Sequence, residues 1–376
     1  MLKETLAKVS ANGLKVVKGE NEMPQMQIDQ RKMKILSVVV DEYIKTGEPV
    51  GSNAVLQHLD MNVSSATVRN DMAFLEKLGM LEQPHTSAGR VPSYDGYRFY
   101  IENLMSPKPL SSKEKKLIDS LLSQANVETA DAVIDNAVNV LSDLTQLAVV
   151  SKSNMPVFSV ITRVEVIPAG RRLYALLIIT SSGTIKNKIC RIEFDLSDEQ
   201  ISYFGKFINE NLFGLNVESL TPAMLQNLAI ALGTYMMSLS PLLHAVYELG
   251  EEIAHVDVNL KGEQKLLTSD GLNSDEIFTL VTHKNELDLL LSSAFDGISV
   301  VFGKENESFA ITNSSMIVSP YQINGKQGGT FGVIGPVRVD YAKMIPHIEY
   351  ISNQVSKRLA LLIENDNEDR KDQINE

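Results

Sequence analysis

The sequence has one cysteine, no tryptophan and no long apolar run. The single Cys190 excludes an intramolecular disulfide and a cysteine-based zinc cluster, which fits a reducing compartment. No apolar run approaches the ~18–20 residues that a membrane-spanning helix needs. The N-terminal stretch alternates Lys with polar residues and lacks the apolar core of a secretory signal. The sequence therefore predicts a cytoplasmic protein without a membrane partner.

Catalytic and metal-binding patterns are also missing. His244 and His255 lack acidic neighbours in ligand geometry, and Cys190 has no His near it in the sequence. The glycines of GKQGGTFGVIGP match neither phosphate-binding loop motif and suit turns and bulges instead. We therefore expect no catalytic residue, metal or cofactor, and we interpret the chain as a protein that is not an enzyme.

The charge balance is acidic, with 35 Lys and Arg against 47 Asp and Glu and a net charge of -12. Residues 27–104 hold 8 basic against 10 acidic residues, so most of the acidity lies outside this region. The region is nevertheless not basic. It cannot act as a general clamp for a polyanion, and any nucleic-acid binding must depend on a few placed groups.

The N-terminal region shows the pattern of three helices followed by two short strands. A turn-rich segment, HTSAG, separates the two strands. The predicted helices cover about 27–47, 52–59 and 64–79, and the strands cover 80–83 and 90–92. This order predicts a winged helix-turn-helix domain over 27–104, after a poorly ordered extension over 1–26.

The third helix has the surface of a DNA-reading helix. On a helix turning 100° per residue, Val68, Met72 and Leu75 share a buried face, and small or polar side chains occupy the opposite face. Arg suits guanine, Asn suits adenine, and hydroxyls with the helix N-terminus suit phosphates. The predicted DNA contacts, including the wing, are Ser64, Ser65, Ala66, Thr67, Arg69, Asn70, Lys77, His85, Thr86, Ser87 and Arg90.

Two less specific readings remain open at this point. The helix fits an ordinary surface helix with a good cap, and the HTSAG segment fits a plain hairpin connection. The nearby aromatic residues are irregularly spaced, which favours core and linker packing over a base-stacking platform. They are Tyr94, Tyr97, Phe99 and Tyr100.

The rest of the chain changes from strands to helices and back. Strand patterns occupy about 157–194, and capping signals at 197–200, Thr221-Pro222 and Ser240-Pro241 open a helical stretch. A helix is expected over 275–291. Strands return from Gly297, and a helix over 345–363 closes the fold. This order predicts an α+β domain that carries a helical insertion.

Four stretches together resemble one family. GEPVGS (47–52), VSSATVRNDMAFLEKLGMLEQPHTSAGR (63–90), GYRFYIE (96–102) and GGTFGVIGPVRVDY (328–341), with SPY at 319–321, look like the bacterial heat-inducible transcription repressor HrcA. The resemblance runs from about residue 27 onward. The chain departs from it at VPSYDGYR, where a Pro-Thr pair and a lysine are expected, and at VRVDY, where Thr-Arg-Met is expected.

The resemblance implies a homodimer of three-domain subunits. Each subunit would hold a winged helix, a GAF-like α/β sheet domain and an inserted, mainly helical dimerisation domain. It also implies repression of chaperone operons through an inverted-repeat operator in double-stranded DNA, and regulation by a GroEL-type chaperonin. The expected segments are 1–26 (extension), 27–104 (winged helix), 105–196 and 278–363 (GAF-like), 197–277 (dimerisation) and 364–376 (acidic tail).

A second class of function stays open. In that reading the GAF-like domain binds a metabolite and the winged helix responds to it. An enzyme is a distant third, since no nucleophile with a base and no metal set stands out.

Overall fold

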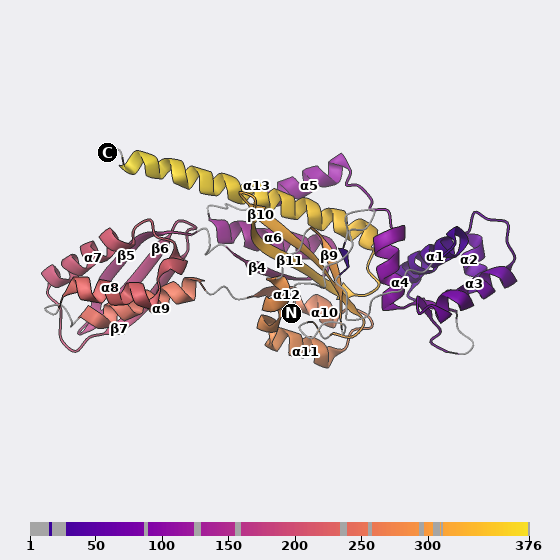
Figure 1. Cartoon of the computed structure of the whole chain (residues 1–376), viewed down its shortest axis with the longest axis horizontal. Coiled ribbons are helices and arrows are strands. Elements are labelled where there is room, and N and C mark those ends of the chain that lie inside the picture. The colour runs from indigo at the N-terminus through magenta and orange to yellow at the C-terminus, as the bar shows by residue number, and fades with distance from the viewer. Residues whose placement is uncertain are drawn as a thin grey trace.

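The protein forms three units in a row (Figure 1). The structure, a computed structural model, describes residues 15–16, 28–85, 89–123, 129–154, 159–233, 239–254, 258–292, 297–303, 309 and 311–374, with backbone alone for 15–16 and 363–374. The N-terminal unit (28–104) lies at one end, the sheet unit lies in the middle, and the outer unit (159–254) lies at the other end. Helices and sheets are thus mixed, as the sequence predicts, with helices first.

The N-terminal unit is built from short capped helices and a two-stranded hairpin. Asp29 accepts the Lys32 N–H at the start of the first helix, and Gly47, with φ 72°, ends it in the left-handed conformation. The elements are α1 (Gln30–Thr46), α2 (Ser52–Gln57), α3 (Ser65–Lys77), β2 (Leu81–Glu82), β3 (Val91–Pro92), α4 (Tyr94–Phe99) and the π-helix η1 (Tyr100–Leu104). Each helix and strand expected here is present within a few residues.

Gly96 lets α4 approach the hairpin. A Cβ at this position would lie 2.0 Å from the Met80 carbonyl oxygen, so Gly96→Ala forces the backbone apart. We expect the N-terminal unit to lose about 1–3 kcal/mol of unfolding free energy, measured by urea denaturation. Gly205→Ala is the matched control, because no atom lies within 4 Å of the Cβ that it adds to a helix. Equal stability of the two variants would contradict the steric argument.

The sheet unit is a six-stranded sheet with helices on both faces. Its order is β1-β9-β10-β11-β4-β8, antiparallel except for the β1–β9 pair. The strands are β1 (Lys15–Val16), β4 (Ala148–Ser153), β8 (Asn259–Lys261), β9 (Ser299–Phe302), β10 (Ser314–Ile323) and β11 (Lys326–Pro336). Alternate strand residues enter two separate cores, since side chains of period two point to opposite faces.

One core of the sheet unit is continuous with the core of the N-terminal unit. It includes side chains from α5 (Ser112–Ser123), α6 (Ala130–Thr145) and α13 (Tyr341–Ile374). The other core includes side chains from α10 (Glu263–Leu267), α11 (Ser274–Thr282), η5 (Lys284–Leu287) and α12 (Asp288–Leu291). A capping box opens α5, with the Glu114 carboxylate accepting the Ser111 N–H at 2.8 Å. In the described part of the chain, no helix is long and apolar enough to cross a membrane.

The outer unit has its own sheet and its own core. The strands β5 (Ile161–Gly170), β6 (Leu173–Thr180) and β7 (Ile185–Arg191) form an antiparallel sheet, and the helices that cover it are α7 (Asp198–Leu212), η3 (Val217–Ser219), α8 (Pro222–Leu232) and α9 (Ser240–Ala254). The capping box predicted at Ser197 is present. Cys190 is buried in this unit, and burial raises the pKa of its thiol.

Three boundaries differ from the expected ones. The strands over 161–191 share a core with α7–α9, so the hydrophobic cores divide near 160 and 255 instead of at 196/197 and 277/278. The helix expected over 275–291 is broken at His283 into α11, η5 and α12. The last helix runs to Ile374, into the segment predicted as an acidic tail. Strand periodicity shows which face of a strand is buried but not which core that face joins. The unit to which the strands over 161–191 belong therefore could not be predicted from their pattern.

Candidate nucleic-acid interface

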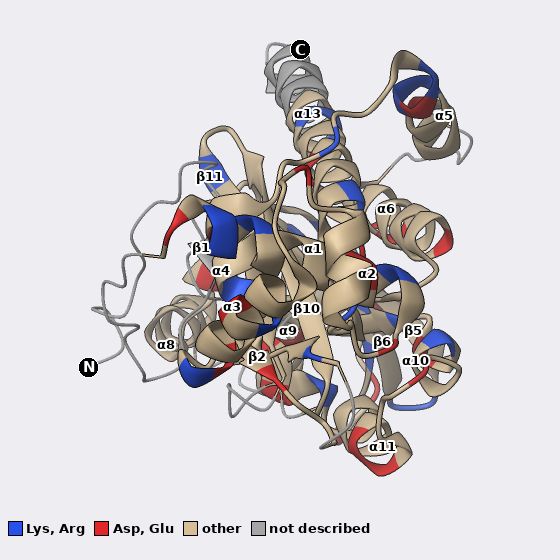
Figure 2. Ribbon diagram, turned by 90° about the vertical axis from the view of Figure 1, so that its right-hand side faces the viewer, with Lys and Arg blue, Asp and Glu red and all other residues tan. Residues whose placement is uncertain are grey.

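Helix α3 presents one apolar and one polar face. Val68, Met72 and Leu75 are buried, as the periodicity predicts. The opposite face is exposed at four of the predicted contact residues, Ala66, Arg69, Asn70 and Lys77. Figure 2 looks onto the N-terminal unit and shows basic and acidic residues interspersed over it, without a continuous basic patch. The arrangement agrees with the nearly balanced charge of this region.

The start of α3 is fixed by hydroxyl groups. Ser64 caps the helix, because its Oγ accepts the Thr67 N–H at 3.1 Å. The Ser65 hydroxyl donates to the Asn53 side-chain oxygen at 2.7 Å, and its Oγ lies 3.1 Å from Ser52 Oγ. Ser65 is therefore engaged with α2. Ser52 and Asn53, at the start of α2, are not among the residues predicted from the sequence, because only the fold brings them to Ser65.

Arg69 and Asn70 are exposed next to this capped end. Neither side chain forms a hydrogen bond or an ion pair with the described part of the chain. A guanidinium and an amide that lack intramolecular partners keep all their donors and acceptors for a ligand. Together with the small Ala66, they leave the first turns of α3 open to a ligand.

Asp71 holds α3 against α1. It is buried on the same helix and pairs with Arg31, with 2.7 Å between Arg31 Nε and Asp71 Oδ2. Lys32 Nζ lies 3.7 Å from the other carboxylate oxygen. The Asp71 carboxylate raises the pKa of Arg31. The negative charge of Asp71 is thus buried and paired inside the unit, so it does not lie on the candidate interface.

The hairpin is anchored at its base. His85 is exposed at the end of β2, while Thr86 and Ser87 lie outside the described residues. Arg90 does not extend freely from the wing. Its Nη2 lies 2.8 Å from Glu76 Oε2, and its backbone pairs with Val50. The geometry gives Arg90 an anchoring role, which its sequence position alone did not reveal.

The aromatic residues that follow the hairpin are not a base-stacking platform. Tyr97 and Tyr100 are buried, and the Tyr100 hydroxyl donates to Asp41 Oδ1 at 2.7 Å. This confirms the packing role predicted for these two residues. Within the described residues, no group of three His, Cys, Asp or Glu side chains is placed to hold a metal ion.

Comparison with known proteins agrees with this picture. Residues 131–345 match the family described as the HrcA protein C terminal domain. The chain is 31% identical to the heat-inducible transcription repressor HrcA of Clostridium acetobutylicum over 89% of its length and 98% of the relative's. It is 32% identical to the protein of the same name from Acetivibrio thermocellus, covering 91% and 99%.

One solved structure is similar over most of the chain. It is a crystal structure of a hypothetical protein at 2.2 Å resolution, with 25% identity and a TM-score of 0.60. The match covers 89% of this chain and all of the other. With a family match over more than half of the sequence and relatives that align over nearly their full length, the chain belongs to the HrcA family of heat-inducible transcription repressors.

Proposed function

We propose that this protein represses chaperone operons by binding, as a homodimer, an inverted-repeat operator in double-stranded DNA. The observation that carries the proposal is the exposed surface of Ala66, Arg69 and Asn70 on a capped helix. The Arg69 and Asn70 side chains have no hydrogen-bond or ion-pair partner among the described residues. In this proposal the N-terminal unit is a winged helix, with α3 in the major groove and the β2–β3 hairpin as its wing.

The chemistry of this surface suits base reading. Ala66 lets the helix end approach the groove, Arg69 can pair with guanine O6 and N7, and Asn70 can pair with adenine N6 and N7. The capped N-terminus of α3 presents backbone N–H groups and the positive end of the helix dipole to a phosphate. Because the unit is almost neutral, affinity must come from these few groups and from their repetition on a second subunit.

The outer unit offers a surface for that second subunit. Helices cover one face of its sheet, and the other face carries half-buried side chains of β6, at Leu173, Ala175, Leu177 and Ile179. Ile185 and Ile189 on β7 extend this face and are more than half exposed. An apolar face repeated on an identical chain is self-complementary about a two-fold axis. We therefore place the dimer contact on this sheet.

The proposed domains follow the three units of the fold. The winged helix covers about 27–104, the outer unit is the dimerisation domain, and the sheet unit is the GAF-like domain into which the outer unit is inserted. In the proposed regulation, a GroEL-type chaperonin keeps the repressor folded. A repressor of marginal stability would lose activity in heat as unfolded proteins occupy the chaperonin.

A gel-shift titration with inverted-repeat duplexes tests the proposed function. Selective binding by the purified protein without any added small molecule supports a repressor that reads DNA directly. Binding that needs an added metabolite would favour the sensor reading instead. A protein that binds inverted-repeat and random duplexes equally would contradict both. Adding chaperonin to heat-treated protein should restore the selective complex if the proposed regulation is right.

The Arg90–Glu76 pair gives a separate prediction. Because Glu76 holds the guanidinium, Arg90→Ala and Glu76→Gln should both loosen the hairpin and cost up to about 1 kcal/mol of stability. Both variants should weaken DNA binding by a similar factor without changing the preferred bases. The check is a salt titration of the complex. If only Arg90→Ala reduces the salt slope, by about one, Arg90 contacts a phosphate directly and the anchoring role is wrong.

A further inference from the structure

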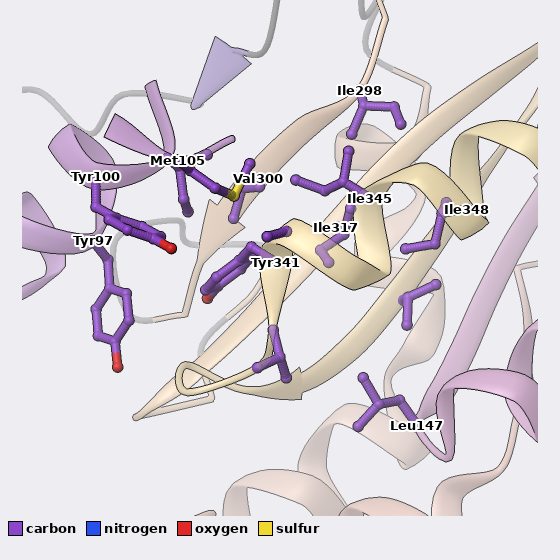
Figure 3. Close-up of a cluster of buried hydrophobic side chains, with 14 of the residues drawn as sticks. Tyr97, Tyr100, Met105, Leu147, Ile298, Val300, Ile317, Tyr341, Ile345 and Ile348 are labelled. Carbon is purple, nitrogen blue, oxygen red and sulfur yellow. The ribbon is translucent and has the colours of Figure 1, made fainter. Parts of the chain in front are cut away.

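Three sequence motifs meet away from the candidate DNA surface. Gly47 opens GEPVGS, Tyr97 lies in GYRFYIE, and Arg338 and Tyr341 end GGTFGVIGPVRVDY. Tyr97 and Tyr341 lie where the N-terminal unit contacts the sheet unit (Figure 3). Arg338 lies against Gly47 and so joins the same two units. The proposed reading of DNA by α3 gives these residues no role. The contact that they form between the two units therefore needs a separate explanation.

Aromatic rings form the centre of this contact. Tyr97 packs against Tyr341, with ring centroids 6.1 Å apart at 61°, and against Phe302 at 6.3 Å. Tyr94 also packs against Phe302, with ring centroids 5.6 Å apart. Tyr97, Phe302 and Tyr341 are almost completely buried. We call these four residues the aromatic seam. Edge-on packing of this kind fixes the relative angle of the two units as well as their distance.

Polar contacts next to the aromatic seam also join the N-terminal unit to the sheet unit. The Asn313 N–H donates to the Tyr94 hydroxyl oxygen at 3.0 Å, and the Lys108 N–H donates to the Ala342 carbonyl oxygen at 2.8 Å. The Arg338 guanidinium rests on Gly47, where a Cβ would lie 3.0 Å from Nη1. Gly47 ends α1, so the cation sits at the negative end of that helix.

The Tyr97 hydroxyl differs from the other polar groups of the seam. It is buried and has no hydrogen-bond partner in the described part of the chain. A buried hydroxyl without a partner does not stabilise a fold. The contribution of Tyr97 must therefore come from its ring, which makes Tyr97→Phe a neutral control for Tyr97→Ala.

We propose that the aromatic seam and Arg338 hold the N-terminal unit in one orientation on the sheet unit, and so set the half-site spacing that the dimer accepts. The spacing part rests on the proposed function. In a two-fold dimer the distance and angle between the two α3 helices depend on how rigidly each N-terminal unit is attached. These are positioning residues, because they act through α3 and not on DNA.

The orientation is tested without DNA by distance measurements between spin labels. Exposed positions on α2 and α11, Gln57→Cys and Ser274→Cys, are labelled in a Cys190→Ser background and diluted with unlabelled chain. The wild type and Tyr97→Phe should give one narrow distance distribution. Tyr97→Ala and Arg338→Ala should give a clearly broader one. Because the Arg338 side chain is 30% exposed, its loss should leave the fold intact. Unchanged distributions in Arg338→Ala and Tyr97→Ala would overturn the proposal.

Operators with altered spacing test the consequence for DNA. Adding two base pairs between half-sites rotates one of them by about 70°. The wild type and Tyr97→Phe should lose at least about tenfold in affinity on this change, and the two loosened variants less than about threefold. Equal losses in all four proteins would overturn the spacing part. If the wild type binds no inverted repeat, the proposed function fails, and the label distances still decide whether the seam fixes orientation.

Discussion

Exchange of Arg69 for alanine is expected to remove most of the preference for the guanine that we propose it contacts, without unfolding the protein. One bidentate contact of this type contributes about 1–3 kcal/mol of discrimination, and a two-fold site makes it twice. The loss should therefore be roughly 30-fold to 20,000-fold in the ratio of operator to random DNA. Asn70→Ala should act similarly at an adenine. Both side chains are exposed and form no hydrogen bond or ion pair within the described ranges, so their removal should cost little stability.

Arg171→Ala is the matched control for Arg69→Ala. It removes the same charge from a side chain that is 84% exposed in the outer unit. The measurement is competitive binding to operators with single base changes, together with a thermal melt of each variant. Should Arg69→Ala and Asn70→Ala discriminate the bases as well as the wild type does, α3 is not the reading helix.

Placing arginine on the uncovered sheet face, by Leu177→Arg, is expected to give a monomer. Leu177 lies on the central strand between Glu165 and Asn187. The next row on one side is Ile167, Ala175 and Ile189, and the next row on the other side is Arg163, Ile179 and Ile185. In an isologous contact two such arginines would face each other in an apolar surface, whereas in a monomer each stays solvated. Losing the second subunit should lower operator affinity by about 10²–10⁴-fold.

Ile230→Arg serves as the control for Leu177→Arg. Ile230 lies on α8 and is 72% exposed, so the same charged group enters the helical side of the same unit. Sedimentation velocity should show a dimer for Ile230→Arg and a monomer for Leu177→Arg, with the same circular dichroism for both. The reverse result would place the dimer contact on the helices.

Local features of this fold were predictable from the sequence because local physics decides them. The buried face of α3 follows from helical periodicity at Val68, Met72 and Leu75, and the start of α3 follows from the cap at Ser64. Long-range pairing was not predictable. The ion pair of Glu76 with Arg90 and that of Asp71 with Arg31 join segments whose local patterns are unremarkable.

The same limit applies to the candidate site. Sequence spacing selected Arg69 and Asn70 as exposed residues but could not show that Ser65 is engaged by Asn53. It also placed the strands of 161–191 in the wrong core, since alternation reveals which face of a strand is buried and not against what. The GYRFYIE motif was recognised, but only the fold brings Tyr97 to Tyr341.

The outer unit is attached to the sheet unit in the position of a hairpin turn. It leaves after β4 and returns at β8, and these two strands pair directly, with Ser151 opposite Asn259. A long connection ordinarily raises the entropy cost of joining such strands. Here the connection is the outer unit, which has a core of its own. The pairing of β4 with β8 and the folding of the outer unit can therefore be separated.

A chain in which residues 154–258 are replaced by a two-residue turn should keep the pairing of β4 with β8. The proposed dimer surface therefore lies on an insertion between two paired strands, a place where a sheet tolerates added chain.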